Sequence, residues 1–422
     1  MVREDLTNSF RLDRKKRRLY YGWVVLTVCL ILVTISYGIR FSFGVFFKSL
    51  EQDFGWTRAV TSGVFSVYML VGSLFAVLGG WVADRRGAKV VFVVMAFLAF
   101  LGLALTSKAG ALWHLFLSYS LLVAMGSGAT YAITTSLGTR WFKQQRGLAL
   151  AIVTSGVGLG SILMAPVASY LIAGYGWRTS YLAIGVIALI VMVPCALLLR
   201  KAPTEILDSS EDKSQQAVSL SPPQKSEEFS LVQSLKTRNF LLMISIWFFY
   251  AFCLFLVMTH IVPHAIDLGI TPVQAASIIS ISGFANIPSR ILMGIVCDRF
   301  SRKKTALACA LVMAAAMLWL NWSSSLWMLY VFAAAFGAAY GGLAPPTVAI
   351  VGDTFGVRHI GTILGVLEIG WVSGAAVGPA LAGYIFDTTG TYSLAFWLGV
   401  ISALIIAVLV LFLKTPAKAR NK

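Results

Sequence analysis

Long apolar runs alternate with short polar segments along most of this chain of 422 residues. A helix that crosses a lipid bilayer needs about 20 mostly apolar residues. Runs of that length recur from end to end, which predicts an all-α membrane protein with twelve transmembrane helices. The predicted spans are residues 22–47, 58–83, 88–107, 111–138, 147–174, 177–199, 239–266, 272–297, 304–322, 326–350, 361–386 and 392–414.

One polar segment is much longer than the other connections. Residues 200–238 are rich in Ser, Gln, Glu, Lys and Pro, a composition typical of a solvated linker. The linker separates a six-span half at 22–199 from a second six-span half at 239–414. A basic N-terminal segment, 1–21, and a short tail, 415–422, complete the predicted organisation.

The composition supports a membrane location and excludes several other classes of protein. Apolar residues make up 58% of the chain, charged residues make up 12%, and the mean hydropathy is +0.82. A water-soluble enzyme, a disordered chain or a nucleic-acid-binding domain would carry about twice that charged share. The five cysteines lie in or beside apolar runs without CxxC spacing, so neither a disulfide framework nor a metal site is predicted.

The basic residues predict how the chain is oriented. Of the 34 Lys and Arg residues, 28 fall in the N-terminal segment, the even-numbered loops, the linker and the tail. Four lie in the opposite loops and two inside spans, at Arg40 and Arg290. By the positive-inside rule both termini are cytoplasmic. Anionic lipid on that side accounts for the net charge of +17 without a nucleic-acid partner.

The two halves repeat each other at a constant offset of 214 residues. Such a parallel repeat of two six-helix units is typical of transporters that rock about a site near the membrane midplane. The matching segments are Gly55–Thr57 with Gly269–Thr271, Gly80–Lys89 with Gly294–Lys303, Gly147 with Gly361, and Gly176 with Gly390.

The same segments carry a resemblance to a known family. GGWVADRRGAK (79–89), echoed by GIVCDRFSRKK (294–304), is similar to the loop motif of the major facilitator superfamily, and the likeness covers essentially the whole chain. Four further segments resemble the monocarboxylate porters and the oxalate/formate antiporters. They are YYGWVVL (20–26), SYGIRFSFGVFF (36–47), WFKQQRGLALAIVTSG (141–156) and HIVPHAIDLG (260–269).

The repeat offers a test of which polar residues belong to the scaffold, because residues that the architecture needs should recur in both halves. Asp84 and Arg85 recur as Asp298 and Arg299. They are predicted at cytoplasmic helix ends, where charge pairs and helix termini stabilise one another. We therefore expect a structural and gating role for these four residues rather than contact with a substrate.

Arg290 fails the repeat test, since Ala76 occupies the matching position. An Arg in mid-span costs about 2.5–3.5 kcal/mol on insertion scales, so such residues usually face a cavity. Asn286 lies one helical turn away on the same face, and Pro288 between them frees a backbone carbonyl. A guanidinium binds a carboxylate through two parallel hydrogen bonds. Arg290 and Asn286 are predicted to bind the substrate, the alternative being a structural arginine.

Two acidic residues are candidates for proton coupling. Glu368 lies inside a span at a position matched by Thr154, and an apolar setting favours the protonated carboxyl. Asp267 lies at a helix end near His260 and His264. The alternative for both acids is a water-exposed helix end.

The sequence departs from the monocarboxylate porters at two positions where that family carries charged groups. The resemblance implies an Asp where this chain has Asn286, and a helix-1 lysine near Phe41. Arg40 lies beside that second position. It is predicted either to snorkel to the lipid headgroups or to line an outer vestibule.

Aromatic residues complete the predicted site. The resemblance implies a cavity lined by the first, fourth, seventh and tenth helices. Tyr131 and Tyr340 are predicted to offer hydroxyls to the substrate there, with packing against a backbone carbonyl as the alternative. Tyr37, Phe336 and Trp371 are candidate apolar walls, although each taken alone also fits core packing.

These residues favour a transporter over an enzyme, because no convergent nucleophile, base or metal ligand set is present. Arg290 is the single deep cation, and the lysine of the oxalate-type exchangers aligns with Trp371. A small monocarboxylate such as lactate, pyruvate or acetate, carried with a proton by alternating access, is therefore predicted, without a cofactor. An oxalate/formate-type anion exchanger is the alternative. The short loops suggest a bacterial inner-membrane protein, and a single chain is expected to suffice for function.

Overall fold

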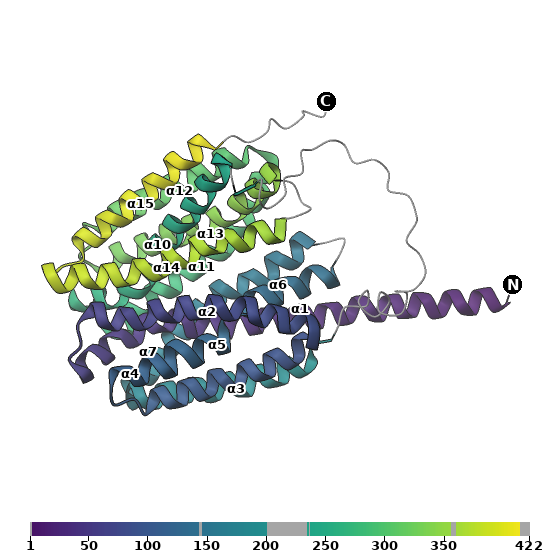
Figure 1. Cartoon of the computed structure of the whole chain (residues 1–422), viewed down its shortest axis with the longest axis horizontal. Helices are drawn as coiled ribbons and strands as arrows, with labels where there is room; N and C mark the ends of the chain where they lie inside the picture. The colour runs from purple at the N-terminus through teal and green to yellow at the C-terminus, as the bar shows by residue number, and fades with distance from the viewer. Residues whose placement is uncertain (1, 143–145, 201–233, 236, 356–359, 414–422) are drawn as a thin grey trace.

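The computed structural model describes residues 2–142, 146–200, 234–235, 237–355 and 360–413, and within them all regular structure is helical. The helices run alongside one another in a single bundle (Figure 1). Their bounds are α1 Val2–Phe54, α2 Arg58–Arg86, α3 Ala88–Ser107, α4 Leu112–Leu115, the π-helix η1 Phe116–Val123, α5 Ala124–Ser127, α6 Thr130–Trp141, α7 Arg146–Leu198, α10 Arg238–Asp267, α11 Pro272–Arg299, α12 Arg302–Leu320, α13 Leu326–Phe355, α14 Ile360–Thr389 and α15 Ser393–Phe412.

The all-helical fold and the number of passes agree with the sequence prediction. Eleven helical spans in the described ranges are long and apolar enough to cross a membrane. One of them, Leu148–Leu198, is broken at Gly176, whose φ of 74° and ψ of 164° are not helical. That break divides the span into two passes, so the chain crosses the bundle twelve times. The short elements α4, η1, α5 and α6 together form one of these passes, Leu112–Trp141.

The repeated glycines mark equivalent turns in the two halves. Gly55 and Gly269 adopt φ values of 65° and 84°, and Gly176 and Gly390 adopt 74° and 72°. Residues with a Cβ rarely take such positive φ values, whereas glycine adopts them readily. The repeat seen in the sequence therefore reflects turns that both halves must make at the same end of the bundle.

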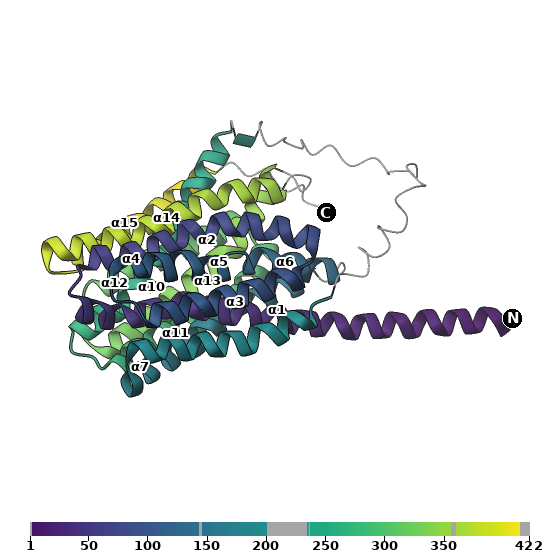
Figure 2. The same ribbon diagram turned by 60° about the horizontal axis from the view of Figure 1, so that its bottom comes forward.

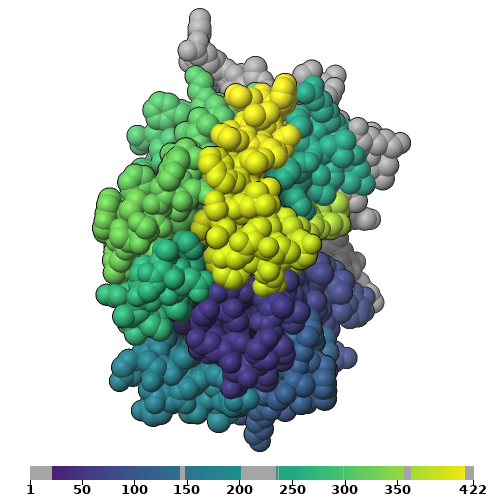
Figure 3. All heavy atoms as spheres, turned by 90° about the vertical axis from the view of Figure 1, so that its left-hand side faces the viewer, coloured from purple at the N-terminus to yellow at the C-terminus, as the bar shows by residue number. Residues whose placement is uncertain are grey.

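The helix bundle has two ends, which we call the termini face and the far face. The termini face carries the ends near residues 87, 200, 300 and 413, and the far face carries the turns at Gly55, Gly176, Gly269 and Gly390. Figure 2 shows α1 extending from the bundle at the termini face. Figure 3 looks onto the far face, where the purple chain near residue 50 lies directly against yellow chain near residue 390.

Small residues let particular helices approach closely, and α14 carries three glycines in such a spacing, at 370, 374 and 378. A Cβ at Gly374 would lie 2.0 Å from the carbonyl oxygen of Phe248, so α14 packs on the backbone of α10 at this point. A Cβ at Gly160 would lie 2.5 Å from the carbonyl oxygen of Thr34, and α7 packs on α1 in the same way. These contacts position the helices around a central space.

The two halves are joined at the far face and separate toward the termini face. In the described part of the chain, the hydrogen bonds and ion pairs between halves lie in the far half of the bundle. Toward the termini face, Val77 and Trp81 of α2 are exposed, as are Leu292 and Ile295 of α11. The structure therefore opens toward the termini face.

Candidate functional site

A cavity of about 130 Å³ lies between the two halves. Both halves contribute to it, through α1, α6 and α7 on one side and α10, α11, α13 and α14 on the other. Six of the residues predicted for the site line this cavity: Tyr37, Tyr131, Arg290, Tyr340, Glu368 and Trp371. The remaining lining residues are Phe41, Val157, Trp247, Tyr250, Leu254, Phe255, Ala344, Thr347 and Val348.

Arg290 forms the cationic part of this cavity. Its guanidinium lies close to the hydroxyl of Tyr131, which comes from the opposite half. The Nε atom of Arg290 is buried without a hydrogen-bond partner. Because buried polar groups are nearly always paired in folded proteins, a donor left open beside a cavity is suited to a ligand acceptor. The ring of Tyr37 lies 6.2 Å from that of Tyr131 and extends the wall toward α1.

Two further polar atoms at the cavity also lack partners. The Tyr340 hydroxyl and the Trp247 Nε1 atom are buried with no hydrogen bond in the described structure. Tyr340 is fixed by its backbone, since its carbonyl oxygen accepts a hydrogen bond from the Tyr250 hydroxyl. Arg290, Tyr340 and Trp247 thus offer a small ligand three hydrogen-bond positions that no protein group fills.

Glu368 supplies the negative charge of the cavity. Its side chain is exposed, and it reaches the cavity from α14. Trp371 lies three residues further along, so both side chains project from the same face of the helix. The Trp371 ring lies 5.1 Å from Tyr250 and 5.9 Å from Phe255. Glu368 therefore borders a wall made of aromatic rings.

Asn286 and Phe336, both expected at the site, do not line the cavity in this conformation. Asn286 is fully buried where α11 meets α13, and a Cβ at Gly341 would lie 2.6 Å from its Nδ2 atom. Both polar atoms of the Asn286 amide lack partners there. Phe336 is fully buried against Phe332, with ring centroids 5.3 Å apart, which is the core packing that the sequence left open.

Asp267 lies at the far face instead of the cavity. Its carboxylate pairs with Arg58 at 2.6 Å and with Lys48 at 3.1 Å, and both partners come from the other half. Two cations at this distance favour the ionised carboxylate, which does not suit the predicted role in proton uptake. The position of Asp267 points to a contact between halves.

Arg58 is the centre of a cluster that joins the halves at the far face. Its side chain is 3% exposed and also contacts Glu51 at 3.1 Å and the Tyr392 hydroxyl at 2.6 Å. The carboxylate of Asp387 accepts hydrogen bonds from the backbone N–H groups of Arg58 and Ala59, at 2.8 and 2.7 Å. A residue of the second half therefore caps the first turn of α2 in the first half.

Arg40 points into the protein rather than to the headgroups. Its guanidinium lies 4.5 Å from the ring centroid of Tyr37, and its Nε donates to the Tyr68 hydroxyl at 3.4 Å. The hydroxyl of Tyr68 is also hydrogen-bonded to Ser127 at 2.7 Å. Aromatic rings and hydroxyls hold this second, half-buried cation beside the cavity wall formed by Tyr37.

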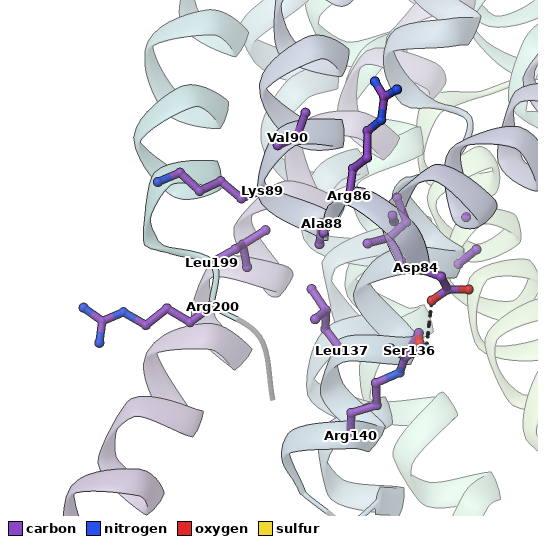
Figure 4. Close-up of a pocket in the computed structure, with 15 residues that line it drawn as sticks. Asp84, Arg86, Ala88, Lys89, Val90, Ser136, Leu137, Arg140, Leu199 and Arg200 are labelled. Atoms are coloured by element: carbon purple, nitrogen blue, oxygen red, sulfur yellow. Dashed lines mark hydrogen bonds and ion pairs between the residues drawn. The ribbon is translucent and has the colours of Figure 1, made fainter. Parts of the chain in front are cut away.

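The residues predicted as scaffold lie at the termini face. Asp84 accepts a hydrogen bond from Arg140 at 2.9 Å, and Arg85 lies over the ring of Trp81 at 4.0 Å. Figure 4 shows the Asp84–Arg140 pair in a separate pocket of about 450 Å³. Arg299 is exposed, and the side chain of Asp298 lies outside the described residues.

Sequence reasoning missed five polar or aromatic lining residues: Phe41, Trp247, Tyr250, Phe255 and Thr347. Trp247 and Tyr250 lie three residues apart on α10, with Leu254 one turn further on the same face. That spacing is the signal that could have found them, but an aromatic stripe on a membrane helix is equally typical of packing.

Comparison with known proteins identifies the family. The model of the Major Facilitator Superfamily matches residues 29–289 and 248–422. The chain belongs to that superfamily. It is therefore a multi-pass membrane carrier and not an enzyme, as predicted.

Relatives that are named transporters span nearly the whole chain. Monocarboxylate transporter 13 of Rattus norvegicus is 28% identical over 89% of this chain and 85% of its own length. Monocarboxylate transporter 12 of Homo sapiens is 27% identical over 95% of this chain and 82% of its own. The chain is thus related to the monocarboxylate transporters, in agreement with the resemblance of its motifs.

A solved structure has the same fold. The crystal structure of a bacterial homologue of the human lysosomal transporter Spinster, in an inward-facing and occupied conformation, matches with a TM-score of 0.70 at 16% identity. The match covers 93% of this chain and 96% of that one. At this identity the likeness concerns the fold alone, and it confirms the predicted twelve-helix architecture.

Proposed function

We propose that this protein is a secondary active transporter that moves a small monocarboxylate, of the lactate, pyruvate or acetate type, together with a proton. The observation that carries the proposal is Arg290, a guanidinium in a central cavity with an open Nε donor. One such cation matches one carboxylate, which it binds through charge-assisted hydrogen bonds. The names of the relatives support the same class of substrate.

The proposed mechanism is alternating access. The substrate carboxylate binds Arg290, the Tyr131 and Tyr340 hydroxyls complete its hydrogen bonds, and a proton neutralises Glu368. The halves then move about the cavity, so that the far-face contacts break as contacts at the termini face form. A carrier loaded with the proton alone leaves Arg290 uncompensated in a closing cavity, which slows that movement and couples the proton to the substrate.

The topology belongs to the same proposal. The distribution of Lys and Arg places both termini in the cytoplasm of a bacterial cell, so the structure corresponds to an inward-open state. The cavity lies within one chain, and we propose that a monomer is the functional unit.

The test is uptake of labelled L-lactate into proteoliposomes, with and without an inward proton gradient. Arg290→Ala should abolish accumulation, because charged hydrogen bonds worth about 1.5–3 kcal/mol each are lost. Arg178→Ala is the matched control, since Arg178 is an exposed far-face arginine paired with Asp53 of the same half, and it should transport normally.

Three outcomes distinguish the possibilities. Gradient-driven uptake that Arg290→Ala abolishes supports proton-coupled transport. Uptake that appears only after the vesicles are preloaded with an anion makes the protein an exchanger of the oxalate/formate type. Undiminished lactate uptake in Arg290→Ala, or no uptake under either condition, contradicts the proposed substrate site.

A further inference from the structure

A pocket of about 450 Å³ opens at the termini face, within the first half and apart from the central cavity. It lies between α2, α3, α6 and the residues that follow α7 (Figure 4). Its charged lining residues are one acid and four cations: Asp84, Arg86, Lys89, Arg140 and Arg200. Because Asp84 pairs with Arg140 at 2.9 Å, the other three cations have no acidic partner among the lining residues. The pocket is therefore suited to an anion.

The three remaining cations surround the pocket with groups that a ligand can reach. The side chains of Arg86 and Lys89 form no hydrogen bond or ion pair with the residues that the structure describes. Lys89 and Arg200 extend from the same side of the pocket, opposite the acidic pair (Figure 4). The Arg200 guanidinium lies 4.3 Å from the ring centroid of Tyr21, which holds it at this rim. The first turn of α3 also begins in the pocket, after Gly87, which provides no side-chain cap, and helix starts favour anions.

The repeat shows that the fold does not require Lys89 to stay open in this way. Its counterpart 214 residues later is Lys303, whose ammonium group donates to the carbonyl oxygens of Leu411 and Leu413 at 2.6 and 2.9 Å. The counterpart of Leu413 is Leu199, which lines the pocket of the first half. The lysine of the second half thus caps the end of a helix, whereas in the described part of the first half Lys89 makes no such bond. Lys89 is therefore available to a ligand.

An exposed apolar stripe leads from the pocket along α3. Val90 lines the pocket and is 48% exposed, and further along the helix Val94, Phe97, Leu101 and Leu105 are also exposed. Their spacing of three or four residues places them on one face of the helix. In a membrane-spanning bundle such a face contacts lipid, so an acyl chain can lie along it while its headgroup reaches the cations. A soluble phosphate compound would meet the charges but make no use of the stripe.

We propose that this pocket binds an anionic phospholipid, with its phosphate between Lys89, Arg200 and the first turn of α3 and an acyl chain along the stripe that begins at Val90. Basic pockets between membrane helices suit phosphate-bearing headgroups. A lipid with a net negative charge is favoured over a zwitterionic one, whose own cation offsets the attraction between its phosphate and the pocket. The inference is independent of the substrate that the central cavity carries.

The experiment follows the reactivity of a cysteine at the pocket. Val90→Cys places a reporter on the lining, and the background is low because the native cysteines are buried. Its reaction with N-ethylmaleimide is timed in detergent-purified protein, in the presence of phosphatidylglycerol, of phosphatidylcholine with the same acyl chains, or of glycerol phosphate. Lys304→Cys is the matched control reporter, since residue 304 is the repeat counterpart of residue 90 and is exposed.

Phosphatidylglycerol at about ten times its Kd should slow the labelling of Val90→Cys about tenfold, because the unoccupied fraction falls by that factor. Phosphatidylcholine and glycerol phosphate should protect the reporter little. Lys89→Gln combined with Arg200→Gln should abolish the protection. Arg238→Gln combined with Lys304→Gln should preserve it, since this pair removes the same charge from exposed positions of the same face outside the pocket. Native mass spectrometry of the two double variants, without a reporter, should show loss of retained phosphatidylglycerol in the first alone.

Four outcomes would overturn the proposal. Unchanged labelling of Val90→Cys with phosphatidylglycerol would show that the pocket stays empty. Equal protection by phosphatidylcholine would show that acyl chains cover the reporter without recognition of charge. Equal slowing at Lys304→Cys would assign lipid binding to the whole basic face. Protection by glycerol phosphate as strong as that by phosphatidylglycerol would replace the lipid by a soluble phosphate compound.

Discussion

Arg58 is the residue whose replacement should most directly shift the balance between the two faces of the transporter. Its side chain is 3% exposed and bridges to Asp267 at 2.6 Å and to the Tyr392 hydroxyl at 2.6 Å, both in the second half. It also lies 3.6 Å from the ring centroid of Phe386. Arg58→Gln removes the charge and most of these contacts but keeps the backbone cap from Asp387.

The expected magnitude follows from the two hydrogen bonds that cross between halves. Bonds to charged groups contribute about 1.5–3 kcal/mol each. Part of this is retained because Lys48 still pairs with Asp267 at 3.1 Å. We expect a net loss of about 2–4 kcal/mol for the state closed at the far face. Since 1.36 kcal/mol corresponds to a factor of ten, the closed-to-open ratio falls by about 30- to 1,000-fold.

The assay is the reaction rate of a buried cysteine with a membrane-impermeant maleimide. The native cysteines are all buried, which keeps the background low. Thr259→Cys is a suitable reporter, because Thr259 is 2% exposed near the contact between halves and its hydroxyl has no hydrogen-bond partner to lose. Reporter labelling should accelerate in Arg58→Gln. It should not change in Arg178→Gln, where the lost ion pair with Asp53 lies within one half.

Two outcomes would refute this reasoning. Equal labelling rates in Arg58→Gln and wild type would show that the cluster does not hold the far face closed. Equal acceleration in Arg178→Gln would show that any loss of charge at this face loosens the structure, without a specific contribution from the contact between halves.

Two further predictions concern stability and the termini face. Gly374→Ala should lower the melting temperature in detergent, since its Cβ would lie 2.0 Å from the carbonyl oxygen of Phe248 and overpacking costs about 1–3 kcal/mol; Gly365→Ala on the same helix meets no atom within 4 Å and should leave it unchanged. Asp84→Asn breaks the exposed pair with Arg140, which is worth at most about 1 kcal/mol. It should alter the rate of transport in the uptake assay while the melting temperature stays near that of wild type, and a large drop in melting temperature would contradict this.

The architecture was predictable from the sequence because the bilayer imposes simple rules. A span must be about 20 residues long and mostly apolar, so hydropathy alone locates the helices. The constant offset between the halves located turns such as those at Gly55 and Gly269. Glycine recurs at these positions because both halves need a residue with positive φ there. The break at Gly176 was predicted as a boundary between spans for the same reason.

The candidate site was predictable only in part, because a sequence shows that a polar residue is unusual but not what it faces. Arg290 and Glu368 have no charged counterpart at the matching position of the other half, and both line the cavity. Asn286 meets the same criterion yet lies against Gly341, where the packing of α11 on α13 decides its position. The direction of a side chain between two helices depends on tertiary contacts that no single helix encodes.

Asp267 illustrates why the location of a charge along a helix does not determine its task. Proximity to His260 and His264 in the sequence suggested a proton site, but the nearest charges in space are Arg58 and Lys48 from the other half. The cluster lies where the halves touch, whereas Arg290 and Glu368 lie where they enclose a space. A residue that recurs in both halves, or that pairs across them, serves the movement of the fold. A charge that faces the enclosed space without a salt bridge in the described part of the chain is available to a ligand, and on this distinction we propose that Asp267 serves the contact between halves and Glu368 the substrate.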